Sequence, residues 1–258
     1  MKKLGIFAWF SYSLPMAERF RLIKETGFDA VSLWWGDKNK ERYPALARSM
    51  GFEIDNIHAP FQNANSLWID REEGEEYLHM LMDCVKDCNQ YQIPTVVIHA
   101  TGFSDLPPVT SVGMGRIQRL VETAEQYKVR LAFENLNGLD YLDAILKTFD
   151  SDFVGFCYDS GHENCYHRDA DCLSQYGNRL FAIHLDDNFG DHDTHLLPFD
   201  GNADWNRIKD SLSKNCTLDF LTLEVDFNPK HEKSQIYQEL SAAEYLARAY
   251  ESVIKVAQ

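Results

Sequence analysis

The sequence predicts one domain, a single (β/α)8 barrel of the α/β class that covers residues 1–258. The length of 258 residues is close to the usual size of such a barrel, about 250 residues. Eight apolar, β-branched runs alternate with eight amphipathic stretches, a pattern that requires parallel strands joined by right-handed crossovers. Residues able to bind cations stand at the ends of runs three to eight, and a closed sheet brings these ends to one pocket.

An open, doubly wound sheet would show the same alternation of strands and helices. Its strand ends would lie along a line that is too long for one cluster of ligands. The first run is also not followed by a glycine-rich phosphate loop, which is the usual sign of a nucleotide-binding sheet. Both points favour the barrel.

The predicted strands are short runs rich in Val, Ile, Leu and Phe, as expected for strands buried on both faces. In chain order they cover residues 4–9, 28–35, 52–57, 95–100, 130–135, 153–158, 180–185 and 218–225.

The predicted helices carry apolar residues three and four positions apart, which gives each of them one buried face. Gly27 and Gly51 stand just after the first two, where a positive φ ends a helix. In chain order the helices cover residues 17–27, 40–51, 72–91, 111–128, 142–151, 170–178, 203–214 and 234–256.

The composition is that of a soluble globular protein, with 45% hydrophobic and 25% charged residues. The N-terminus imitates a secretion signal only in part, because Ser11, Tyr12 and Ser13 follow a short apolar run that is better interpreted as the first strand. No apolar stretch reaches the roughly 20 residues that span a bilayer. Six scattered cysteines do not suggest a disulfide framework. We therefore expect a cytoplasmic protein without a membrane partner.

The net charge of −15 argues against nucleic acid as a partner, because proteins that bind nucleic acids display clustered Lys and Arg. The loops expected around the pocket hold a single arginine, Arg71. Bound metal ions would offset part of this negative charge. Lys230 and Lys233, after the last strand, are either solvated or available to a phosphate or carboxylate.

The residues that can bind cations fall at strand ends. Glu134, Asp159, His184 and Glu224 end runs five to eight, and three carboxylates with one imidazole suit Zn²⁺, Mn²⁺, Mg²⁺ or Co²⁺. For Asp159 an alternative is a helix cap, since the segment reads DSGH. Five further candidates complete the set of nine: His58, His99, His162, Asp193 and His195.

Together, the motifs NIHAPF, VIHATG, FENLNG, YDSGH, IHLDDNFGDHDTHLLPFDG and LEVDF resemble the xylose-isomerase-like barrel superfamily. They span residues 58–226 in order. That group contains sugar and sugar-phosphate isomerases and epimerases, a group acting on inososes, and apurinic endonucleases of the endonuclease IV type. The resemblance implies a divalent-metal enzyme with a small sugar or sugar-phosphate substrate, and it allows a homo-oligomer.

For the epimerase branch, the resemblance makes Glu134, Asp159, His184 and Glu224 the ligands of one metal ion. Glu134 and Glu224 would also exchange a proton with the carbon beside the substrate carbonyl, through an enediolate that the metal stabilises. His162 resembles a histidine that hydrogen-bonds the substrate. A dehydratase of cyclic polyols would use the same metal and base.

The endonuclease branch uses all nine residues. His58, His99 and Glu134 resemble the ligands of a first zinc, and Glu134 bridges to a second that Asp159, His184 and Glu224 complete. His162, Asp193 and His195 resemble those of a third. A multinuclear zinc phosphodiesterase is therefore the alternative. Two departures from the family pattern are Phe199, where glycine is usual, and FENLNG in place of Glu-Asn-His.

Aromatic and amide side chains near the strand ends are candidates for the substrate site. Trp9 and Trp35 can pack against the C–H face of a sugar, and Asn135 can hydrogen-bond a hydroxyl. Other aromatic residues near strand ends can serve the same purpose or belong to the core: Phe7, Trp34, Phe61 and Trp68.

Overall fold

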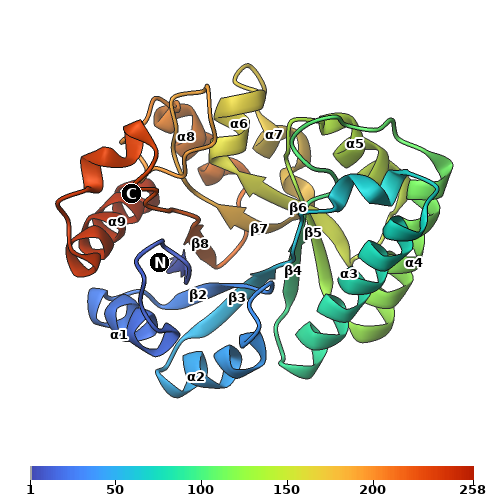
Figure 1. The fold of residues 1–258 in the computed structure, drawn as a ribbon. Helices are drawn as coiled ribbons and strands as arrows, with labels where there is room; N and C mark the ends of the chain where they lie inside the picture. Colours follow the sequence, from blue (N-terminus) through green and yellow to red (C-terminus); the bar gives the residue numbers. More distant parts are fainter. Residues whose placement is uncertain (1) are drawn as a thin grey trace.

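The computed structural model describes residues 2–258, in which eight parallel strands form a barrel surrounded by helices (Figure 1). This confirms the predicted α/β barrel. The strands are β1 (Lys3–Phe7), β2 (Ala30–Trp34), β3 (Glu53–His58), β4 (Thr95–Ile98), β5 (Arg130–Glu134), β6 (Val154–Asp159), β7 (Leu180–His184) and β8 (Phe220–Leu223).

The helices follow the strands in alternation and cover the outside of the barrel. They are α1 (Met16–Thr26), α2 (Tyr43–Ser49), α3 (Glu72–Gln90), α4 (Ser111–Tyr127), α5 (Leu139–Thr148), α6 (Ser160–Tyr166), α7 (Cys172–Tyr176), α8 (Trp205–Asn215) and α9 (Ala242–Ala257). Short 3₁₀ turns occur at η1 (Lys40–Arg42), η2 (Ala64–Trp68), η3 (Gly177–Arg179) and η4 (Glu232–Tyr237).

The strands pair in chain order from β1 to β7, and β8 pairs with β1. The strands β7 and β8 are joined by an isolated bridge and not by a continuous ladder of backbone hydrogen bonds. There the Leu185 amide donates to the Thr222 carbonyl at 2.9 Å, and the Glu224 amide donates to the Leu185 carbonyl at 3.1 Å. These two bonds set His184 and Glu224 side by side at the carboxyl end of the barrel.

The last helix differs from its prediction. The pattern predicts one helix over residues 234–256, but η4 ends at Tyr237 and α9 starts only at Ala242. Ser241 caps α9 in a capping box with Glu244, so the hydroxyl and carboxylate satisfy amides that the helix itself leaves free. The same apolar spacing therefore continues across a break in the backbone.

A layer of small side chains lies inside the barrel beneath the strand ends. Val97, Ala132, Cys157 and Ala182 form a separate buried cluster, each two residues before a predicted ligand on β4 to β7. Because side chains two positions apart share a face of a strand, the ligands point to the same interior. The small layer leaves room for imidazole and carboxylate groups above it.

None of the helices in residues 2–258 combines the length and apolar character needed to cross a membrane. The cysteines of this part of the chain are free thiols.

Candidate metal centre

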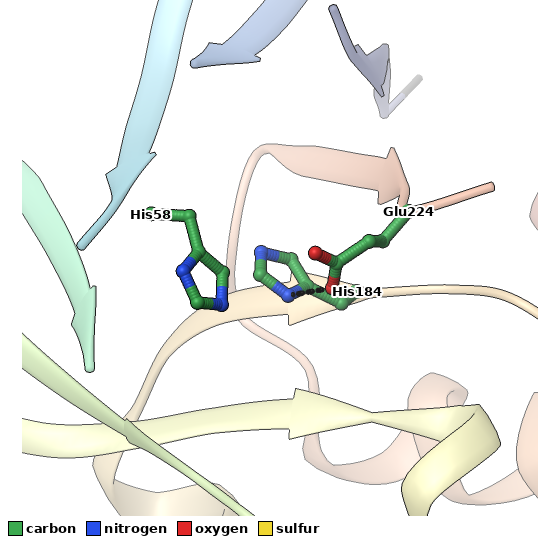
Figure 2. Close-up of side chains that lie close together, drawn as sticks. All are labelled: His58, His184 and Glu224. Carbon is green, nitrogen blue, oxygen red and sulfur yellow. Dashed lines mark ion pairs between the residues drawn. The ribbon is translucent and has the colours of Figure 1, made fainter. Parts of the chain in front are cut away.

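The nine predicted ligands come together at the carboxyl ends of β3 to β8. Seven of them are buried, and Asp193 and His195 are partly exposed at the mouth of the centre. Figure 2 shows how side chains from three different strands, His58, His184 and Glu224, point into one space. Five groups of side chains in the described chain have ligand atoms close enough to hold a cation, and three of them are described in turn below. His162 belongs to none of the five.

The central group consists of Glu134, Asp159, His184 and Glu224. Nδ1 of His184 lies 2.8 Å from Oε1 of Glu134 and 2.5 Å from Oε2 of Glu224, so one imidazole faces two carboxylates. Burial alone would raise the pKa of Glu224, but the charge and hydrogen bond of His184 outweigh it and hold that pKa at about 2.

Asp159 has both of the roles that the sequence allows. Its Oδ1 accepts a hydrogen bond from the His162 amide at 2.5 Å and so caps α6. Its Oδ2 is buried without a hydrogen-bond partner and belongs to the central group. Burial, together with the charges of Glu134, Asp193 and Glu224, raises the pKa of Asp159 to about 7, although His162 acts against the shift. The three carboxylates of the central group therefore carry more negative charge than its one imidazole, His184, can balance.

The second group consists of His58, His99 and Glu134. Nδ1 of His58 lies 2.8 Å from the Ala59 carbonyl, which makes Nδ1 the protonated nitrogen and leaves Nε2 free. That Nε2 lies 3.2 Å from Nε2 of His99 and 3.5 Å from Oε2 of Glu134. Burial lowers the pKa of His99 to about 4, so the ring is neutral and its nitrogen can act as a ligand.

The third group joins Asp193 and His195 to Asp186, a residue that the sequence analysis did not single out. Oδ2 of Asp193 lies 3.1 Å from Nε2 of both His162 and His195. This carboxylate can therefore be balanced by two imidazoles without any ion. His195 has φ 46, a conformation that is strained for a residue other than glycine and is found most often at functional sites.

Several buried carboxylate oxygens of the centre have no hydrogen-bond partner in the described chain and could instead bind a divalent cation. Glu134 Oε2, Asp159 Oδ2 and Asp186 Oδ2 are buried acceptors without a hydrogen-bond partner in residues 2–258. Leaving such an oxygen unpaired costs about 1–3 kcal/mol, and more when it is charged. A cation bound among these oxygens would remove the cost.

The sequence analysis missed two residues near the centre, Asp186 and Cys157. Asp186 lies two positions after His184, beyond the strand end on which the search relied, in the acidic pair of LDDN. Cys157 shares the inner face of β6 with Asp159, and its Sγ lies 3.8 Å from Oε1 of Glu134. The two-residue alternation of a strand was the signal that could have found Cys157.

A cavity of about 690 Å³ opens beside the centre. It meets the centre at His58, His195 and Glu224 and extends along the loops after β1, β2 and β3. Its lining is Phe7, Trp9, Trp34, Gly36, Asp37, Lys38, Asn39, His58, Phe61, Gln62, His195, Glu224, Val225 and Asp226. A volume of this size is typical of a site for a small molecule.

Of the two tryptophans expected at the substrate site, Trp9 lines the cavity and Trp35 does not. Trp9 is 44% exposed and lines the cavity. Trp35 does not, because it is buried on the outer side of the barrel, where its indole N–H donates to Asp87 of α3 at 2.8 Å. Its neighbour Trp34 lines the cavity, with its ring centroid 5.6 Å from that of His58. The expected contact thus moves from Trp35 to Trp34.

Asn135 is fully buried and holds the end of β6. Its amide nitrogen donates to the Asp159 carbonyl at 2.8 Å, and its oxygen accepts from the Asp159 amide at 2.7 Å. Both ends of the amide are therefore occupied by backbone. Asn135 positions Asp159 and is not free to bind a sugar hydroxyl.

Most of the chain matches the model of a known family. Residues 20–245 match the family model of the xylose isomerase-like TIM barrel. The chain belongs to this family. The predicted superfamily is thereby confirmed.

Two proteins, both called uncharacterized, are similar to this chain in sequence. The protein y4fM of Sinorhizobium fredii is 42% identical over 98 residues, which is 38% of this chain and 31% of that protein. The chain thus matches less than a third of the length of y4fM. The protein MJ1311 of Methanocaldococcus jannaschii is 23% identical over 234 residues, 82% of this chain and 80% of that protein.

Solved structures of other barrels are similar in fold. The IolI protein, crystallised with a zinc atom, superposes with a TM-score of 0.81 at 20% identity and covers 99% of this chain and 98% of its own. D-psicose 3-epimerase, crystallised in the presence of D-fructose, gives a TM-score of 0.79 at 15% identity over 99% of this chain and 98% of its own. At these identities the similarity shows the fold alone.

Proposed function

We propose that this protein is a divalent-metal-dependent isomerase or epimerase of sugars. The observation that carries the proposal is the pair of buried carboxylates, Glu134 and Glu224, which approach the same imidazole from β5 and β8. Glu224 also reaches the small-molecule cavity. The similarity in fold to D-psicose 3-epimerase supports the proposal as an analogy.

The reaction needs a base and an acid near one carbon atom. One carboxylate removes the proton from the carbon beside the substrate carbonyl, and the electron pair of that C–H bond moves towards the carbonyl oxygen. The other carboxylate first takes up a proton from water and then gives it to the carbon skeleton as the carbonyl re-forms. Glu134 and Glu224 lie on different strands, so they can act on different sides of a substrate between them.

Glu134, Asp159, His184 and Glu224 would hold the metal ion. When bound, a divalent cation stabilises the negative charge that develops on the substrate oxygens. Asn135 fixes Asp159 through the backbone, and Phe61 stacks on His99 at 4.3 Å, which shields that side of the centre from water. Trp9 and Trp34 would form apolar walls for the sugar.

The proposal is tested by proton exchange in D₂O. The metal-loaded protein is incubated with a panel of ketoses and aldoses, and deuterium in each sugar is measured by NMR. We expect deuterium at the carbon beside the carbonyl of at least one sugar. If no ketose or aldose takes up deuterium, the proposed function is wrong.

The second candidate function is a multinuclear zinc phosphodiesterase. It is favoured by the two additional groups, His58–His99–Glu134 and Asp186–Asp193–His195, which could hold further ions next to the central one. Clustered zinc ions can activate water and stabilise the leaving oxygen in phosphodiester hydrolysis. The net charge of −15 and the acidic cavity wall oppose a polyanionic substrate.

Counting the metal ions separates the two functions without any choice of substrate. Elemental analysis of the purified protein should give one tightly bound ion per chain for the isomerase. Three zinc ions per chain together with cleavage of abasic DNA would establish the phosphodiesterase. A dehydratase of cyclic polyols would hold one ion and release water from an inosose, which the same NMR experiment detects.

A further inference from the structure

The cavity beside the metal centre is larger than one sugar ring requires. Its volume of about 690 Å³ equals that of about 23 water molecules at about 30 Å³ each. A hexose has only twelve carbon and oxygen atoms. Moreover, the centre contributes only three lining residues, His58, His195 and Glu224, and the other lining residues lie farther out along the loops. Space therefore remains beyond a sugar whose reacting carbon lies at Glu224.

An aromatic platform stands in the outer part of the cavity. The guanidinium of Arg19 lies 4.6 Å from the ring centroid of Trp9, and Arg19 is itself fixed by donating to the carbonyls of Leu14 at 3.1 Å and Ala8 at 3.4 Å. This support holds the indole in place although 44% of Trp9 is exposed. A large ring kept partly exposed in a cavity suits the apolar face of a sugar.

The charges on the cavity wall exclude a phosphate. Asp37, Glu224 and Asp226 line the cavity together with one lysine, Lys38, and the imidazoles of His58 and His195. Oδ1 of Asp226 is buried and has no hydrogen-bond partner in the described chain. Lys233, one of the lysines considered for a phosphate, instead pairs with Asp191 at 2.5 Å. A dianionic group would be repelled by this wall, whereas neutral hydroxyls would not.

Polar side chains at the outer end complete a site for hydroxyl groups. Lys38, Asn39 and Gln62 line the cavity, and all three side chains are exposed. They offer donors, and Asn39 and Gln62 also offer amide oxygens. Donors, acceptors and aromatic faces together are the features that bind a neutral polyhydroxylated ligand.

We infer that the outer cavity binds a second, uncharged sugar ring joined to the sugar that reacts. The substrate is then a reducing disaccharide or a glycoside with a carbonyl on its ring, and not a free monosaccharide or a sugar phosphate. The inference rests on the proposed function for its reacting end, but the outer site can be tested separately.

The experiment measures deuterium uptake by the metal-loaded protein from three kinds of substrate: reducing disaccharides and keto-glucosides, the corresponding monosaccharides, and their phosphates. We expect kcat/KM for at least one two-ring substrate to exceed that for its monosaccharide about tenfold or more, as one well-bound ring can provide. The double variant Asn39→Ala, Gln62→Ala should bring this ratio close to one. Gln118→Ala on the exposed face of α4 is the matched control and should leave the ratio unchanged.

A binding measurement separates failure of the inference from failure of the proposed function. Saturation-transfer NMR detects contact between the protein and an unreactive disaccharide without any turnover. If monosaccharides or their phosphates exchange as well as the two-ring substrates, the inference is wrong and the proposed function stands. If no sugar exchanges but the disaccharide binds and the double variant weakens it, the outer site stands and the function is wrong. If no sugar exchanges and the disaccharide does not bind, both the inference and the proposed function are wrong.

Discussion

Glu134 joins two of the three ligand groups, because its two oxygens face different imidazoles. Oε1 lies 2.8 Å from Nδ1 of His184, and Oε2 lies 2.7 Å from Nε2 of His99. Burial works against ionisation, but the positive charge and the hydrogen bond of His184 hold the pKa of Glu134 well below its usual range. A single ionised carboxylate therefore links the central group and the His58–His99 group to β5.

The proton-transfer roles of Glu134 and Glu224 give a residue-level prediction. Glu134→Gln and Glu224→Gln should each lower deuterium exchange by about 10²–10⁴-fold at saturating metal, since an amide cannot accept the substrate proton. Glu244→Gln, at the exposed start of α9, is the control and should exchange like the wild type. Rates are followed by NMR. Full activity in either of the first two variants would remove that residue from the mechanism.

The two roles of Asp159 can be separated by a matched variant. Asp159→Asn should weaken the binding of a divalent metal by about 100-fold or more, measured by titration calorimetry, because it loses a charged ligand. Asp171 caps α7 by the same kind of side-chain bond, with Oδ1 accepting from the Ser174 amide, but it lies outside the ligand groups. Asp171→Asn should leave metal affinity unchanged. Equal affinity in both variants would mean that Asp159 is only a helix cap.

The sequence predicted the site residues correctly where the position of a residue in its strand determines which way its side chain points. His58, Glu134, Asp159 and His184 are the last residues of their strands, so the end of an apolar run located them directly. It could not separate Trp34 from Trp35. Both are apolar, and neighbouring side chains at the end of a strand point to opposite sides. Only the position of Asp87 on α3 shows which indole is turned outward.

At the scale of elements, the strands carry two successive layers of side chains. On β4 to β7 the small layer of Val97, Ala132, Cys157 and Ala182 lies two residues before the ligands. This spacing follows from the strand period and sets the depth of the centre. The apolar periodicity located each strand, but it missed α6 and misplaced the start of α9, because backbone breaks at Asp159 and Ser241 depend on capping bonds and not on apolar spacing.

The small layer predicts the effect of a larger side chain. Ala182→Leu should push His184 upward, destabilise the fold by about 1–3 kcal/mol through overpacking, and weaken metal binding. Urea unfolding and calorimetry measure the two effects. Ala247→Leu on the exposed side of α9 serves as the control and should change neither. A stable Ala182→Leu variant with normal metal affinity would show that the layer does not support the centre.

At the scale of the whole molecule, closure of the barrel gathers the ligands. Residues from Phe7 to Asp226 reach one cavity and centre although they are far apart in the chain. Eight alternating units predicted this closure, and the pairing of β8 with β1 realises it. The isolated bridge between β7 and β8 could not be foreseen, because it depends on two backbone hydrogen bonds around Leu185.

Because the four ligands of the central group come from the ends of β5 to β8, a bound metal should stabilise the barrel. A divalent ion at 100 times its dissociation constant adds about 2.7 kcal/mol to the free energy of unfolding. For a chain of this size that raises Tm by about 5–10 °C. Thermal unfolding with EDTA and with added Zn²⁺ or Mn²⁺ measures the difference. An unchanged Tm with every divalent metal would contradict a metal site built across the barrel.

The central claim is that this centre transfers a proton at a sugar carbon with the help of a divalent metal. The most direct measurement is deuterium uptake by a sugar in D₂O, followed by NMR with the protein as purified, after chelation, and after reloading with metal. The account predicts uptake that chelation abolishes and reloading restores. Uptake that is indifferent to chelation, or no uptake in any of the three states, would contradict it.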